Sequence, residues 1–310
     1  MKLKLIAAAL AFAAAGSAHA TMDGAASGNG SLIMNLRFYD TAPSTQNVSA
    51  AFDLGVNMND VLAWNGVKGF TRTWNLSTGA VTGTGIAGSQ QVGTYGNAWS
   101  SFNTTVAGSS VANPASKIEF NVIALDMTGE GTAGVNGVRY LSTGDTSFAG
   151  ITNTNLIAFK DMDAYVNANN GLGTHASAAN GASVVSKGVG AAYFGTVVGN
   201  TAGDGWVAHT SEDTTKTLAT AQDFWLLTNA AGNGAATSAK TAFGYDVDMD
   251  GVIEANNGLA ANSNEFGTWT VNAAAGTITY ANPVPEPETY ALMLAGLGLV
   301  GFMARRRQAA

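Results

Sequence analysis

The chain has 310 residues and few charges. Charged residues make up 11%, against about 25% in an average protein, and there are 39 glycines, 5 prolines and no cysteine. This composition excludes coiled coils and basic nucleic-acid binders, while the 46% of hydrophobic residues excludes a disordered chain. The formal net charge of −7 opposes phosphate backbones, so we expect no nucleic-acid partner.

Residues 1–20 have the three parts of a secretory signal peptide. Lys2 and Lys4 form a basic start, residues 5–15 form an apolar run, and the segment ends in Ala18-His19-Ala20, with small residues where signal peptidase cleaves. We therefore expect cleavage by signal peptidase before Thr21 and export of a β-rich domain that covers residues 21–282. Because this exported domain has no disulfides, its stability must come from core burial, sheet pairing or bound ions.

Strand patterns separated by turn-rich segments dominate this domain. Apolar residues alternate in 32–38 and 118–124, and residues 70–76, 191–198 and 224–227 are further expected strands. Residues 268–271 and 277–280 predict a hairpin whose five-residue loop ends at Gly276. Helices are expected only at 161–169, stopped by Gly171, and at 212–221, and residues 78–96 are expected to form a long surface loop. The fold class predicted is mainly β, an antiparallel β-sandwich or jelly roll with few short helices.

The sequence offers few catalytic groups. His175 and His209 lie among Gly, Ala, Ser and Thr, which predicts exposed positions in loops or at strand edges. Two pairs of acidic residues, Asp161 with Asp163 and Glu212 with Asp213, have two interpretations: the paired carboxylates of a glycosidase, or solvated helix starts. No nucleophile elbow or phosphate-binding loop is found, and the GxGxxG match at residues 83–88 opens no helix. We therefore expect a protein that is not an enzyme.

One acidic segment has the spacing of a calcium loop. Carboxylates stand at the first, third, fifth and ninth places, a glycine at the sixth, and a backbone carbonyl is available at the seventh. The residues concerned are Asp246, Asp248, Asp250, Gly251, Val252 and Glu254. The segment resembles the first half of an EF-hand or dockerin loop, but Asn257 replaces the bidentate glutamate at the twelfth place. A structural Ca²⁺ loop and an acidic Asp-Gly surface turn both remain open.

The tryptophans have two possible roles. Trp64, Trp74 and Trp269 lie in or beside strand patterns, which predicts burial in the core. Trp206 follows Gly203-Asp204-Gly205 and is the candidate for stacking on a sugar ring.

Residues 283–310 combine three unlike parts in a fixed order. A proline-flanked acidic motif covers residues 284–289, an apolar helix is expected at 290–304, and a basic tail follows. Fifteen helical residues at about 1.5 Å each span about 22 Å, less than the roughly 30 Å of a bilayer core, which favours a temporary hold in the membrane. The basic tail, which stays in the cytoplasm by the positive-inside rule, consists of Arg305, Arg306 and Arg307.

These parts resemble the PEP-CTERM sorting domain of Gram-negative bacteria. The resemblance implies that Pro285, Glu286 and Pro287 are recognised by an exosortase, a membrane-embedded cysteine transpeptidase. It also implies a precursor held transiently in the inner membrane, followed by release to the cell surface or the extracellular space.

Three functional hypotheses follow. The first is a non-enzymatic surface or extracellular-matrix protein linked to exopolysaccharide and biofilm. The alternatives are a carbohydrate-binding module, with or without Ca²⁺, and an enzyme that acts on polysaccharide.

Overall fold

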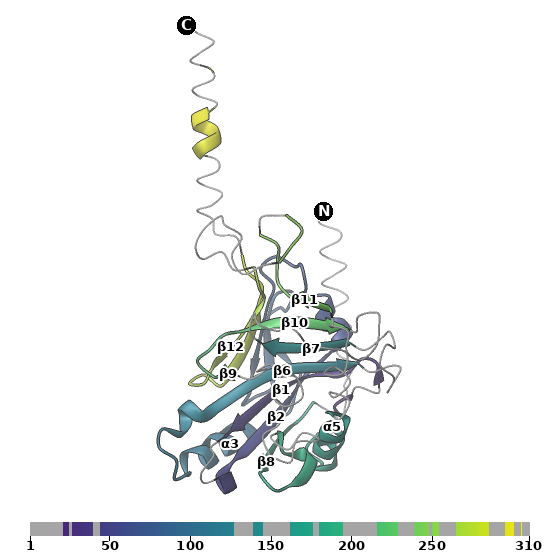
Figure 1. The fold of residues 1–310 in the computed structure, drawn as a ribbon, viewed down its shortest axis with the longest axis vertical. Helices are drawn as coiled ribbons and strands as arrows, with labels where there is room; N and C mark the ends of the chain where they lie inside the picture. Colours follow the sequence, from purple (N-terminus) through teal and green to yellow (C-terminus); the bar gives the residue numbers. More distant parts are fainter. Residues whose placement is uncertain are drawn as a thin grey trace.

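The computed structural model describes residues 21–24, 27–39, 44–126, 139–144, 162–175, 180–194, 216–228, 239–247, 250–253, 265–284, 295–300 and 305 (Figure 1). Its strands are β1 (Ser31–Phe38), β2 (Val48–Asn57), β3 (Thr71–Asn75), β4 (Ala80–Gly83), β5 (Gln90–Gln91), β6 (Ile118–Asp126), β7 (Arg139–Gly144), β8 (Ala182–Ser186), β9 (Lys216–Thr217), β10 (Gln222–Thr228), β11 (Ala239–Ala242), β12 (Thr268–Asn272) and β13 (Thr277–Ala281). The helices are α2 (Met58–Leu62), α3 (Ala98–Ala107) and α5 (Met162–Gly171), with 3₁₀ turns η2 (Ser44–Gln46), η3 (Pro114–Lys117) and η5 (Gly190–Ala192). The prediction of a mainly β fold with few short helices is confirmed.

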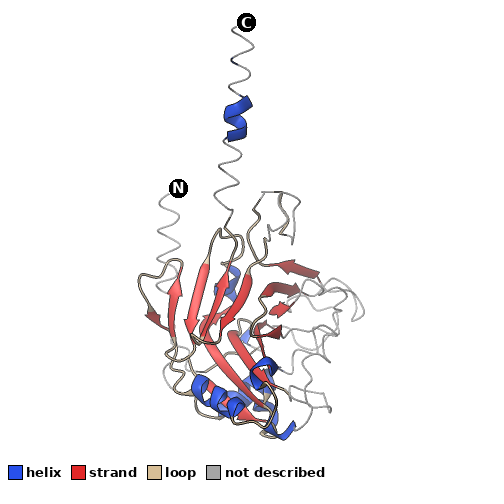
Figure 2. Cartoon of the chain, turned by 90° about the vertical axis from the view of Figure 1, so that its left-hand side faces the viewer, coloured by secondary structure: helices blue, strands red, loops and turns tan. Residues whose placement is uncertain are grey.

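The strands form one curled sheet in place of the two separate sheets expected for a sandwich or jelly roll. Its order is β5-β4-β3-β13-β12-β10-β7-β6-β1-β2-β8, with β11 beside β10 and β9 beside β6. The sheet bends where β10 meets β12, because these strands pair only through Gln222 with Trp269 and Asp223 with Thr268. Figure 2 shows the strands curving around a common interior. Sequence patterns report which residues face inward, but they do not report whether two facing walls belong to one hydrogen-bonded sheet.

The two edges of the sheet meet near β5 and β8. Gly93 and Asn180 form an isolated parallel bridge there, and the backbone N–H of Thr94 donates to the Asn180 carbonyl at 2.7 Å. The Asn180 side chain also donates to the carbonyl of Val92. These contacts join the chain next to β5 to the chain next to β8 and so bring the two edges of the sheet together.

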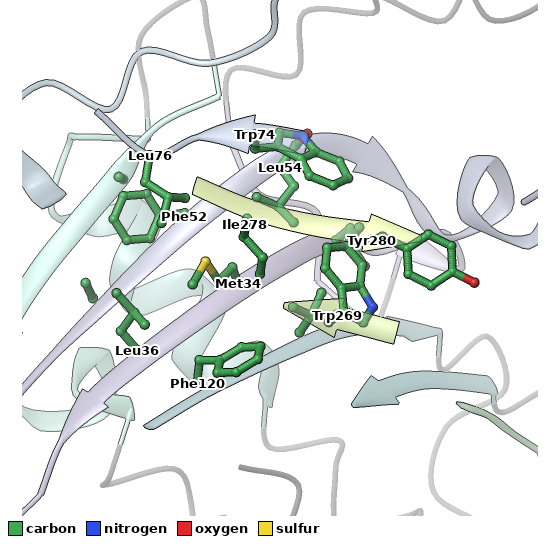
Figure 3. Close-up of a cluster of buried hydrophobic side chains, with 14 of the residues drawn as sticks. Met34, Leu36, Phe52, Leu54, Trp74, Leu76, Phe120, Trp269, Ile278 and Tyr280 are labelled. Carbon is green, nitrogen blue, oxygen red and sulfur yellow. The ribbon is translucent and has the colours of Figure 1, made fainter. Parts of the chain in front are cut away.

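The main core fills the concave face of the sheet (Figure 3). Alternate residues of β1 and β6 form one wall, and aromatic residues of β3, β12 and β13 form the wall that faces it. Trp74 joins the walls, because its indole N–H donates to the Leu54 carbonyl on β2 at 2.8 Å. Trp64 and Trp269 are fully buried and Trp74 is 1% exposed, which confirms the prediction that these three tryptophans belong to the core.

A second layer covers the outer face of the sheet. Residues of β1, β6, β7 and β10 pack there against α5, which contributes Tyr165 and Val166. The Tyr165 hydroxyl donates to Asn35 Oδ1 at 2.6 Å, and Asn35 Nδ2 donates to Asn121 Oδ1 at 2.9 Å. Because both faces are covered, every residue of β1 is buried. The α5 prediction is confirmed.

Helix α3 was not expected from the sequence. Its residues Ala98, Trp99, Phe102 and Val106 are buried at helical spacing, and the helix contacts β2 and β8. Figures 1 and 2 place α3 and α5 at the end of the sheet opposite the C-terminal segment.

Three local predictions were wrong. Residues 190–192 form η5, whereas a strand was expected over 191–198, of which 195–198 lie outside the described residues. Residues 216–217 form β9 instead of continuing a helix, because they pair with Glu119 and Phe120 of β6. The expected loop at 78–96 contains β4 and β5, since Gly79 and Gly83 adopt positive φ and allow tight turns.

Candidate functional site

The C-terminal end of β13 is anchored firmly to the body. Asn282 is 3% exposed, and its Nδ2 donates to the carbonyls of Trp64 at 2.7 Å and Val67 at 2.9 Å. Its Oδ1 accepts the Tyr280 hydroxyl at 2.6 Å, and the backbone N–H of Gly69 donates to the Pro283 carbonyl at 3.2 Å. The folded body therefore extends to the residue before Val284.

Val284, the first residue of the expected sorting motif, is 59% exposed. The motif residues Pro285, Glu286 and Pro287 lie outside the described residues. The motif therefore begins within two residues of a hydrogen-bonded anchor, with no long linker between them.

Part of the expected apolar helix is described. Residues 295–300 are helical and stand apart from the sheet (Figure 1), and Leu297, Leu299 and Val300 are each more than 60% exposed (62%, 63% and 61%). Arg305 is exposed, whereas Arg306, Arg307 and the rest of 290–304 lie outside the described residues. Among the described helices, none is long and apolar enough to cross a membrane.

The acidic segment at 246–254 is described in part. Gly251 has a φ of +95°, and its backbone N–H donates to Asp246 Oδ2 at 2.8 Å. Asp250 Oδ1 accepts the N–H of Val252 at 2.8 Å. These bonds form the sharp turn expected at Gly251, while Asp248 and Glu254 lie outside the described residues. Within the described part of the chain, no group of three or more acidic, His or Cys side chains has a metal-binding arrangement.

Two surface grooves are lined by neutral side chains. The larger, about 720 Å³, lies where β12 diverges from β9 and includes Asn103, Ser116, Thr217, Thr270 and Asn272. The smaller, about 370 Å³, lies between the α3 start and β8. Among the residues that the structure describes, neither groove is lined by a carboxylate, a basic group or a tryptophan. The sugar-stacking candidate Trp206 lies outside the described residues.

His175 is fully buried, so the prediction of an exposed histidine was wrong. The backbone of Thr174 and His175 packs directly on Gly181, where a Cβ would overlap the Thr174 carbonyl. Neither ring nitrogen has a hydrogen-bond partner among the described residues. Burial lowers the pKa of His175 to about 4, so the ring is neutral at neutral pH. His209 and the carboxylates Asp161, Glu212 and Asp213 lie outside the described residues, and Asp163 lies in the first turn of α5.

Asp53 is a buried carboxyl group that none of the sequence motifs includes. It lies on the outer face of β2 with 1% exposure, where Oδ1 accepts the Gly55 N–H at 3.0 Å. Oδ2 has no hydrogen-bond partner in the described part of the chain. Burial, with a smaller contribution from the nearby Asp23, raises the pKa of Asp53 to about 7 even though the Gly55 hydrogen bond lowers it. The available signal was a single charged residue within the otherwise uncharged strand 48–57.

Comparison with known protein families finds a match for one region of the chain, at its C-terminal end. The family model described as the PEP-CTERM protein-sorting motif matches residues 283–307. Neither the curated proteins nor the solved structures gave a match. The matched residues start at the anchored end of β13 and contain the motif and basic tail identified above. The chain therefore carries a PEP-CTERM protein-sorting motif at its C-terminus, which indicates an exported protein sorted by exosortase.

Proposed function

We propose that this protein is a non-enzymatic component of the cell surface or extracellular matrix, delivered there by exosortase and associated with exopolysaccharide. The observation that carries the proposal is the sorting motif attached directly to the anchored end of a β-rich body. A body without a long C-terminal linker is suited to delivery as one folded unit. The chain has a net negative charge, and neutral side chains line its larger groove. Both features suit an environment of hydrated polysaccharide.

The intact mass of the native protein in envelope and extracellular fractions tests this proposal. The expected product begins at Thr21, ends near Pro285 to Pro287 and is found outside the cell. A species in the membrane fraction that retains Arg305 to Arg307 would contradict release. A motif variant, Glu286→Ala, should accumulate as that longer species, and Gln90→Ala, at an exposed position of β5, should not.

A Ca²⁺-dependent carbohydrate-binding module is the second candidate. The turn at Gly251, closed by the Asp246 carboxylate, supports it, because a calcium loop requires this turn between its fifth and seventh ligands. Calorimetric titration with Ca²⁺ should show binding that Asp248→Ala weakens and that Asp223→Asn, on β10, leaves unchanged. Absence of binding heat and of a shift in melting temperature would remove the Ca²⁺ component.

A glycan array tests the carbohydrate component separately. Binding through the larger groove should be weakened by Asn272→Ala, whereas binding through the stacking candidate should be weakened by Trp206→Ala. An array without signal, or a signal that neither variant changes, would contradict this candidate. The third hypothesis, an enzyme that acts on polysaccharide, requires two facing carboxylates, and the described lining of neither groove supplies one.

A further inference from the structure

Threonines cover the outer face of one wall of the sheet, the wall made by β4, β3, β13 and β12. Side chains alternate along these strands, so that buried residues of the main core are followed by residues that point outward. Most of the outward residues are threonine, and the others are asparagine or alanine. They are Ala80 and Thr82 of β4; Thr71, Thr73 and Asn75 of β3; Thr277, Thr279 and Ala281 of β13; and Thr268, Thr270 and Asn272 of β12.

The strand registers bring these side chains into straight rows. Thr73 lies opposite Thr82 on one side and opposite Thr279 on the other, and Thr279 lies opposite Thr270. A row of threonines, one from each strand, therefore crosses the wall. The flanking rows are Asn75, Thr277 and Asn272 on one side and Thr71, Ala281 and Thr268 on the other. These three rows are here called the threonine array.

Backbone geometry fixes the spacing of the threonine array. Neighbouring strands lie about 4.8 Å apart, and alternate residues along one strand are separated by about 6.7 Å. Threonine is branched at Cβ, which restricts the rotation of its side chain. The hydroxyls of Thr73 and Thr279 are also hydrogen-bonded to each other at 2.9 Å. Hydroxyl and methyl groups are therefore held at regular positions in two dimensions.

The chemistry of the array is uniform. Thr82, Thr270 and Asn272 are exposed, and Thr73 and Thr279 are half-buried between their neighbours. None of the side chains in the three rows is charged or aromatic, although charged residues are the ones most often found on exposed surfaces. The array therefore offers no charge for an ionic ligand and no aromatic anchor for a protein partner or a sugar ring.

A ligand that matches the array is uncharged and repeats in two dimensions. The surface of ice meets both conditions, because its water molecules are neutral donors and acceptors and its oxygen atoms lie in rows. In hexagonal ice the repeats of these rows are close in length to the spacing between strands and to the spacing of alternate residues. The hydroxyl of threonine can donate to and accept from water, and its methyl group fits between rows of oxygen atoms.

We propose that the threonine array is an ice-binding surface. The hydroxyls hydrogen-bond to water molecules of the ice lattice, and the rigid backbone keeps their spacing constant, so little conformational entropy is lost on binding. This function goes beyond the proposed delivery to the cell surface and does not depend on it.

Partitioning into slowly growing ice tests the proposal. The purified full chain is mixed with an unrelated acidic protein of similar size, and part of the solution is frozen onto a cold surface. A growing crystal excludes most solutes but incorporates proteins that adsorb to it. We expect the chain to be enriched several-fold in the ice fraction relative to the reference protein.

Tyrosine substitutions locate the binding surface. Thr279→Tyr at the centre of the array and Thr270→Tyr at its exposed edge place a ring above the plane of the hydroxyls, and each should reduce the enrichment to the level of the reference protein. Thr104→Tyr, at an exposed position of α3, is the matched control and should keep the enrichment of the parent chain. Circular dichroism and thermal denaturation establish that each variant is folded. Because Thr270 is exposed, Thr270→Tyr leaves the core packing intact even if Thr279→Tyr disturbs it.

Several outcomes would overturn the proposal. Equal exclusion of the chain and the reference protein from ice would do so, as would enrichment that neither array variant reduces. Binding to crystalline cellulose is measured in parallel. Cellulose binding that both variants abolish, without enrichment in ice, would assign the array to a solid polysaccharide instead. Sedimentation equilibrium tests a second copy of the chain as the occupant: a dimer that Thr270→Tyr dissociates, again without enrichment in ice, would make the array a dimer interface.

Discussion

Replacement of Asp53 by asparagine should stabilise the protein at alkaline pH. Burial and the nearby Asp23 raise the pKa of Asp53 from 3.8 to about 7. Between these values the folded state holds a proton that the unfolded chain has released. The free energy of unfolding contributed by Asp53 is therefore fully present below pH 3.8, is lost as the pH rises toward 7, and is constant above that.

The magnitude follows from the pKa difference. One pKa unit corresponds to about 1.4 kcal/mol, so ionisation of Asp53 costs the folded state about 4 kcal/mol at pH 8.5 relative to strongly acidic solution. At pH 5 less than half of this cost has been incurred. The Asp53→Asn variant would keep the bond that Oδ1 accepts from the Gly55 N–H, and its amide has no charge to lose. The stabilisation by Asp53→Asn should therefore be about 3 kcal/mol larger at pH 8.5 than at pH 5.

Urea denaturation followed by tryptophan fluorescence at the two pH values measures this difference. The comparison between variant and parent cancels the titration of all other groups. Asp250→Asn, at an exposed carboxylate, controls for the change in net charge. An equal effect of Asp53→Asn at both pH values, or destabilisation at pH 8.5, would contradict the burial of the Asp53 carboxyl group.

The remaining predictions concern the core, the edge closure and the buried histidine. Trp269→Ala should cost about 3 to 5 kcal/mol in urea denaturation, because a fully buried indole is removed from the main core; a loss below about 1 kcal/mol would place Trp269 outside it. Gly55→Ala should be more destabilising than Gly66→Ala in thermal denaturation. Both glycines have positive φ, but only at Gly55 would a Cβ meet Asn180 Nδ2, at 2.6 Å. Equal effects would argue against the contact that joins the two edges of the sheet. Burial lowers the pKa of His175 from 6.5 to about 4, so the unfolded chain takes up a proton before the folded protein does. The free energy of unfolding should therefore fall by up to about 3 kcal/mol as the pH drops from 6.5 to 4. His175→Gln should lack this loss, and an unchanged acid profile would contradict burial of the neutral ring.

Much of the local structure could be predicted from the pattern of side chains. β1, β6 and the β12–β13 hairpin follow from alternation and turn residues, and α5 follows from its stop at Gly171. Strand β2 was not among the expected strands, and several other segments that failed have a weak local pattern. β9 has two residues and exists because it pairs with β6, and β5 has two residues that pair with β4. Helix α3 is rich in Ser and Thr, so its helicity depends on the burial of Trp99 and Phe102.

The candidate functional residues also fall into two groups, those that the sequence could identify and those that it could not. The sorting motif could be found from the sequence because its parts are contiguous and act through local chemistry: prolines that keep the backbone extended, an apolar run and a basic tail. The environments of Asp53 and His175 could not, because their burial depends on strands and loops that approach from elsewhere in the chain. Gly181, for example, allows the backbone at His175 to pack on β8.

By itself the sequence determined the class of fold, the core tryptophans and the sorting motif at the C-terminus, since each depends on residue type and short-range spacing. Tertiary structure decided that the facing walls form one curled sheet, since that depends on which strands pair across long separations. It also decided that Met22, near the start of the expected exported domain, is hydrogen-bonded to Asn170 of α5. Met22 and Asn170 meet only when the intervening chain has folded, and no local pattern encodes a contact across 148 positions.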